Sequence, residues 1–108
     1  GTVRALAVTS PEPTPLAPGL RPAREAVPGF EAETWFGVYG PANLPAPLAA
    51  QYATAAAEAV RDPALAERFA GLGAEVRGGN GPALAATARA EREKWTRLVR
   101  ELGIKPEG

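Results

Sequence analysis

The pattern of apolar positions is most regular, in the first half of the chain, over residues 33–39, which read Glu-Thr-Trp-Phe-Gly-Val-Tyr. Aromatic and β-branched side chains of this kind fit a pleated, half-buried surface. From Trp35 onward both alternating faces are apolar or small, which is typical of a parallel strand covered by helices on both sides. The pattern therefore predicts a central strand over 33–39. Gly37 inside it predicts that another backbone or a ligand comes close there.

A second short apolar run occupies residues 3–9, Val-Arg-Ala-Leu-Ala-Val-Thr, and ends at Ser10-Pro11. After Arg4 both faces of this run are again apolar, so it predicts a second buried strand. Two buried strands followed by helical sequence predict an α/β fold class.

Helical periodicity replaces strand alternation after residue 45, and it predicts helices over about 47–61, 64–71 and 82–102. Asp62-Pro63 supplies an N-cap and a first helical residue for the second helix, and Gly71 and Gly73 predict its end. Gly103 is expected to end the third helix. The apolar stripe of that helix consists of Leu84, Ala88, Trp95, Leu98, Val99 and Leu102.

Residues 10–30 contain six prolines and leave little room for a regular element. Two interpretations stay open for this segment. It is either a disordered linker or an ordered segment that crosses between two lobes of a larger protein. Apolar residues at intervals, such as Leu16, Leu20 and Phe30, favour the crossing segment because they can anchor it.

The amino-acid composition excludes several classes of function. The 108 residues carry twelve Lys plus Arg against twelve Asp plus Glu, so the electrostatic footprint of a nucleic-acid-binding protein is absent. No Cys, His or Met is present, which excludes thiol and imidazole nucleophile–base pairs and ordinary zinc sites. We expect no catalytic residue, no metal site and no cofactor. That the chain is not an enzyme is an expectation that rests on the family resemblance given below.

Three further features have a structural explanation. Glu31 and Glu33 lie on the same face of a predicted strand and could act as paired carboxylates. Because they lie at the polar entrance of that strand, we expect them to be solvated charges instead. The glycine-rich loop over 78–81 precedes a helix and could bind an anion, although capping by Asn80 accounts for the same residues. The charged face of the last helix is expected to be solvated surface.

The order of several short motifs resembles one known family. These motifs are Val3-Arg-Ala-Leu-Ala-Val-Thr-Ser10, Val27-Pro28-Gly29-Phe30-Glu31, Trp35-Phe36-Gly37, Gly40-Pro41-Ala42, Asp62-Pro63, Leu72-Gly73-Ala74-Glu75 and Leu102-Gly103-Ile104-Lys105. In this order they are similar to the C-terminal third of the Bug proteins, the extracytoplasmic solute-binding receptors of tripartite tricarboxylate transporters.

The resemblance implies that residues 1–108 are the C-terminal portion of a two-lobe, periplasmic-binding-protein-like receptor. Residues 1–9 would be a strand, 10–30 the crossing segment, and 31–108 a strand and helices that complete a lobe. Such a receptor would be periplasmic, would capture a small organic carboxylate and would deliver it to membrane permease subunits. The residues expected on the ligand side of this portion are Ser10, Trp35, Phe36 and Gly37.

An alternative of a different class stays open. The last helix, with Trp95 and Leu98, could form a partner-binding or dimer face in a protein-interaction module that has no ligand. The apolar faces of the two expected strands also predict that the isolated chain forms a homodimer.

Overall fold

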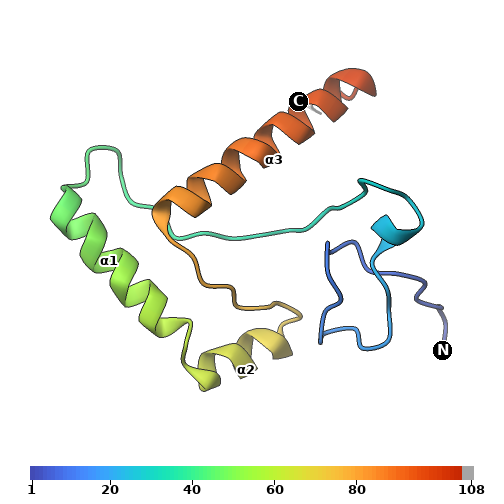
Figure 1. Cartoon of the computed structure of the whole chain (residues 1–108), viewed down its shortest axis with the longest axis horizontal. Helices are drawn as coiled ribbons and strands as arrows, with labels where there is room; N and C mark the ends of the chain where they lie inside the picture. The colour runs from blue at the N-terminus through green and yellow to red at the C-terminus, as the bar shows by residue number, and fades with distance from the viewer. Residues whose placement is uncertain (106–108) are drawn as a thin grey trace. The chain divides into compact units, whose positions relative to one another are not determined.

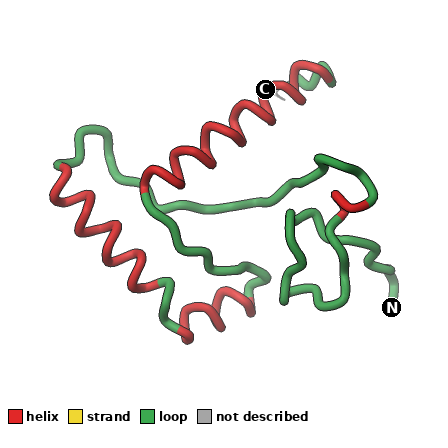
Figure 2. The backbone as a smooth tube through the Cα atoms, viewed as in Figure 1, coloured by secondary structure: helices red, strands yellow, loops and turns green. Residues whose placement is uncertain are grey.

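Helices and loops make up residues 1–105, the range that the computed structural model describes (Figures 1 and 2). The helices are η1 (Ala23–Glu25, a 3-10 helix), α1 (Ala46–Ala59), α2 (Pro63–Gly71) and α3 (Gly81–Glu101). The three α-helices lie within two residues of the ranges predicted from periodicity. The chain divides into two compact units, one formed by Gly1–Val38 with Asp62–Val76, the other by Tyr39–Arg61 with the chain from Arg77 onward.

Side-chain caps start α2 and α3 at the predicted residues. The Asp62 carboxylate accepts a hydrogen bond from the Ala64 backbone N–H at 2.9 Å, and Pro63 is the first helical residue. The Asn80 side-chain oxygen accepts from the Ala83 N–H, also at 2.9 Å. Each cap satisfies one of the N–H groups that a helix leaves without a partner in its first turn.

A left-handed glycine ends α3, as predicted. Gly103 has φ 64° and donates its N–H to the Arg100 carbonyl at 3.2 Å, while the Ile104 N–H reaches the Val99 carbonyl at 3.0 Å. This pair of bonds is the Schellman motif, in which glycine adopts a conformation that a side chain disfavours. Gly73, with φ 75°, follows α2 in the same conformation.

The predicted strands over 3–9 and 33–39 are wrong, and so is the α/β fold class with its place in a two-lobe binding-protein fold. Among residues 1–105 the structure has no strand and no sheet; one isolated parallel bridge joins Val8 to Pro22. A strand forms its hydrogen bonds with a neighbouring strand, and a pair of strands alone is at best marginally stable in water. Both segments therefore remain loops in this chain (Figure 2).

The proline-rich segment 10–30 folds into a series of turns. It contains no helix longer than η1, and backbone bonds tie it to the end of the preceding run. The Val8 N–H donates to the Arg21 carbonyl at 3.1 Å, and the Ala23 N–H donates to the Val8 carbonyl at 2.8 Å. The assignment of this segment as a connector between lobes stays a prediction.

No aliphatic or aromatic side chain is buried anywhere in the described range. Pro22, at the bridge to Val8, is buried, but α1, α2 and α3 each bury no residue. The side chains expected at the centre of the sheet are among the most exposed, with Phe36 at 89% and Val38 at 80%. The described chain thus has secondary structure and local turns without a hydrophobic core.

Candidate functional site

Ser10 lies in a turn of the chain, two residues after the bridge residue Val8. Its hydroxyl donates a hydrogen bond to the Glu12 backbone carbonyl at 2.8 Å, and the side chain is partly buried. A serine that bonds to the backbone two residues ahead stabilises a turn of this kind. The bond therefore holds the Glu12 backbone close to Ser10.

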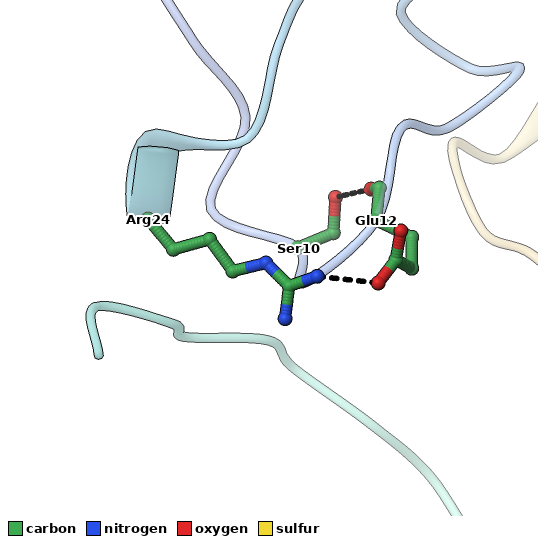
Figure 3. Close-up of polar contacts among 3 residues, drawn as sticks. All are labelled: Ser10, Glu12 and Arg24. Carbon is green, nitrogen blue, oxygen red and sulfur yellow. Dashed lines mark hydrogen bonds and ion pairs between the residues drawn. The ribbon is translucent and has the colours of Figure 1, made fainter. Parts of the chain in front are cut away.

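Arg24 reaches the same turn from η1. One guanidinium nitrogen, Nη2, lies 2.5 Å from Oε1 of Glu12 and forms an ion pair with it (Figure 3). The backbone bond from Ala23 to Val8 holds the start of η1 beside the run that leads into Ser10. Arg24 thus meets Glu12, twelve residues earlier in the sequence, at the Ser10 turn, and we call Ser10, Glu12 and Arg24 the Ser10 cluster.

The remaining predicted site residues lie in the same compact unit as the Ser10 cluster. The Ala32 N–H donates to the Thr9 carbonyl at 3.0 Å, which ties the segment before Trp35 to the residue before Ser10. Trp35 is partly buried and Phe36 is exposed. Within residues 1–105 no hydrogen bond joins Trp35, Phe36 or Gly37 to the Ser10 cluster, so the structure connects these residues only through the backbone.

Glu12 and Arg24 were missed by reasoning from the sequence. The pair is twelve residues apart in a proline-rich segment, where no helical or strand spacing relates one position to the other. The available signal is the sequence Pro22-Ala-Arg-Glu-Ala, in which a proline at the first position favours a helical turn. The partner of its arginine depends on how the prolines fold the chain back.

A second polar cluster lies on α3. Glu91 accepts from the indole N–H of Trp95 at 2.7 Å and from the Lys94 ammonium at 2.8 Å. The same ammonium lies 4.9 Å from the centre of the Trp95 ring, a cation–π distance. These hydrogen bonds, with that from Lys94 the larger, lower the pKa of Glu91 below its ordinary value.

Glu91 interrupts the apolar stripe of α3, which the sequence could have revealed. Positions 84, 88, 91, 95, 98 and 102 alternate in spacing by four and three residues, so a carboxylate at 91 lies among apolar neighbours. The structure resolves this conflict within the helix, because Trp95 and Lys94 bind both carboxylate oxygens.

The charged face of α3 lies between Arg89 and Glu101 and consists of side chains of this helix alone. Its ion pair, from Arg97 to Glu101, spans 3.8 Å and is exposed at both ends. Exposed pairs at this spacing stabilise little, which agrees with a solvated face. Residues 1–105 contain no group of acidic side chains suited to a metal ion and no helix with the length and hydropathy to span a bilayer.

Comparison with known proteins settles the family. Residues 1–104 match the model of the tripartite tricarboxylate transporter family receptor. The chain belongs to this receptor family. Among curated relatives it is 37% identical over 101 residues to the UPF0065 protein in the clcB-clcD intergenic region of Pseudomonas knackmussii, covering 92% of this chain and 60% of that one.

Two further relatives are longer than the matched region. The UPF0065 protein in the tcbD-tcbE intergenic region of a Pseudomonas species is 35% identical over 92% of this chain, and a UPF0065 protein of Bordetella bronchiseptica is 32% identical over 98%. The chain spans 30% and 32% of their lengths, respectively. No solved structure matches this member of the receptor family.

Proposed function

We propose that this chain is the C-terminal portion of a periplasmic receptor that captures a small organic carboxylate for a tripartite transporter and delivers it to the membrane permease subunits. The observation that carries the proposal is the match of residues 1–104 to the receptor family of tricarboxylate transporters. The share of the longer relatives that the chain spans, about a third, supports its being one portion of a receptor.

The described surface supports the same proposal. Large apolar side chains such as Phe36 and Val38 are exposed, and exposed apolar groups of this size are normally covered by a partner or by another part of the same protein. Covering them requires apolar surface that residues 1–105 do not supply, because no aliphatic or aromatic side chain is buried there.

We further propose that Ser10, Trp35, Phe36 and Gly37 contribute to the ligand side of the receptor. Ser10 offers a hydroxyl within a fixed turn, and Trp35 and Phe36 offer apolar surface that can cover the carbon skeleton of a ligand. Gly37 offers a backbone without a side chain, which lets a ligand approach closely.

Calorimetry tests the proposal with a panel of mono-, di- and tricarboxylates, against the complete protein and against residues 1–108 alone. We expect micromolar binding by the complete protein and none by the 108-residue chain, because residues 1–105 bury no aliphatic or aromatic side chain and so cannot enclose a ligand. Failure of the complete protein to bind any member of the panel would refute carboxylate capture.

Gly37→Val tests the site assignment, with Gly79→Val as the matched control because nothing lies within 4 Å of a Cβ at Gly79. We expect the first substitution to weaken carboxylate binding by the complete protein and the second to leave it unchanged. Normal binding by Gly37→Val would remove Gly37 from the site.

A protein-interaction module remains the second candidate, favoured by the partly exposed apolar stripe of α3, in which Trp95, Val99 and Leu102 are open to solvent. A tight oligomer of the 108-residue chain that Leu102→Asp dissociates would support this candidate. A receptor that binds carboxylates as a monomer would exclude it.

A further inference from the structure

The Ser10 cluster already contains the contact that a carboxylate ligand would require. The Glu12 carboxylate is bound to the Arg24 guanidinium beside the hydroxyl of Ser10 (Figure 3). Arginine presents five N–H donors in a planar fork that matches a carboxylate, preferably through two parallel hydrogen bonds. The resident pair uses a single guanidinium nitrogen, Nη2. Within residues 1–105 no other hydrogen bond of the Arg24 side chain is present, so its remaining donors are open to a ligand.

The resident pair is also easily replaced. The Arg24 side chain is 41% exposed and the Glu12 side chain 72%, so water competes for both groups. Ion pairs with this exposure stabilise a fold little, because the gain in attraction is offset by solvation and by side-chain entropy. Glu12 can therefore move into solvent when another carboxylate binds Arg24, without leaving a buried charge.

The backbone around Arg24 is better fixed than the pair itself. The Ala23 N–H is bonded to the Val8 carbonyl, and within η1 the Ala26 N–H returns to the Ala23 carbonyl at 3.1 Å. Arg24 is thus presented from a short helical turn that is tied to the run leading into Ser10. A positively charged group held in this way is preorganised, and preorganisation lowers the entropy cost of binding.

We propose that Arg24 binds the carboxylate of the transported solute and that Glu12 is a built-in competitor, which occupies the guanidinium until the solute displaces it. This inference rests on the proposed function and adds the residue that recognises the charged group, together with the contact that excludes weak ligands. A solute carboxylate that bonds to two guanidinium nitrogens displaces Glu12, which bonds to only one. A ligand group that cannot form both bonds leaves Glu12 in place.

Arg21 provides a matched control close by. It forms an ion pair with Glu25 at i, i+4 spacing, its side chain is 82% exposed, and it stands three residues before Arg24. Its charge and neighbourhood are similar, but within residues 1–105 no ion pair or hydrogen bond joins its side chain to Glu12 or Ser10. Arg21→Gln removes the same charge as Arg24→Gln and keeps the Ser10 cluster.

The experiment measures dissociation constants of acetate, succinate and citrate by calorimetry on the complete protein and on four variants. Hydrogen bonds to charged groups typically contribute enough that Arg24→Gln should weaken the tightest of the three ligands roughly 10- to 100-fold. Arg24→Lys, which keeps the charge and loses the fork, should lie between Arg24→Gln and the unsubstituted protein. Arg21→Gln should stay within about twofold, as befits an exposed charge outside the contact.

The Glu12→Gln variant distinguishes two roles of Arg24, which either binds the ligand or only stabilises the loop. If Glu12 competes with the ligand, its substitution should tighten binding about two- to fivefold, the range that displacement of an exposed ion pair allows. If Arg24 only fixes the loop through Glu12, both substitutions should weaken binding together, which would overturn the inference. Unchanged affinity of Arg24→Gln would also overturn it while leaving carboxylate capture intact. Absence of binding by the unsubstituted protein would instead refute the proposed function, and this inference with it.

Discussion

α3 and residues 33–39 carry similar large apolar side chains, but their backbones are satisfied in different ways. α3 runs over Gly81–Glu101, with Asn80 capping its start and Gly103 closing its end. Residues 33–39 include Trp35, Phe36 and Val38, yet this segment pairs with no strand in the described part of the chain. Phe36 is left 89% exposed.

The difference shows where the two kinds of regular structure obtain their hydrogen bonds. A helix satisfies its own interior N–H and carbonyl groups, so its caps and its spacing are sufficient to define it. A strand exposes both edges until neighbours pair with it. An apolar strand sequence without a neighbour therefore marks a surface that is completed by another segment or another molecule.

The largest expected effect follows from this incomplete segment. We expect the isolated 108-residue chain to associate at tens of micromolar, with Trp35, Phe36 and Val38 buried in the shared interface. Phe36→Asp should weaken the association at least tenfold, because burial of a phenylalanine side chain contributes roughly 1.5–3 kcal/mol. Sedimentation equilibrium measures the change.

Leu102→Asp is the control, since Leu102 is 69% exposed but lies on the helical stripe of the other unit. It should leave the association unchanged if residues 33–39 form the interface. A chain that is monomeric at these concentrations would contradict the prediction. If Leu102→Asp dissociated the chain and Phe36→Asp did not, the interface would lie on α3 instead of residues 33–39.

The same contrast explains how much of the structure the sequence could predict. The helix ends were predictable because Asp62, Asn80 and Gly103 act on backbone groups within a few residues. The strand at 33–39 was predicted wrongly because a strand with two apolar faces requires a neighbouring strand and covering helices. Residues 1–105 provide no strand that pairs with it. The place of Ser10 on the ligand side was implied by the family resemblance and stays a prediction. The contact of Arg24 with Glu12 depends on turns among six prolines, which no sequence periodicity defines.

A glycine after a helix provides the next test. Gly73 adopts φ 75°, so Gly73→Ala places a side chain in the left-handed region and should destabilise the end of α2 by roughly 1–2 kcal/mol. Gly71, the last residue of α2, has open space at its Cβ, and Gly71→Ala should stabilise the same helix by up to about 0.5 kcal/mol. Amide hydrogen exchange across α2 measures both. Equal effects of the same sign would show that the glycine conformation is irrelevant.

The start of α3 should respond somewhat less. Asn80→Ala removes the acceptor of the Ala83 N–H, and loss of such a cap costs about 1 kcal/mol. Asn80→Asp keeps an acceptor oxygen and should preserve the helix start. Cα chemical shifts of the first turn report the population of the helix in each variant. Full helicity of Asn80→Ala would mean that tertiary contacts, rather than the cap, define this end.

The smallest expected effect is a pH dependence within α3. The hydrogen bonds from Lys94 and Trp95 lower the pKa of Glu91 from its ordinary value of 4.5 in the folded helix. A carboxyl group with a lowered pKa in the folded state contributes its stabilisation fully above the unfolded value and loses it as the pH falls through the folded value. The indole N–H resonance of Trp95 should therefore stay constant above about pH 5 and shift below about 4.5, as Glu91 becomes protonated and releases the bond. Glu91→Gln should abolish this shift, and Glu93→Gln, on the charged face, should retain it. A Trp95 resonance that titrates in the same way without Glu91 would show that another carboxylate controls the indole.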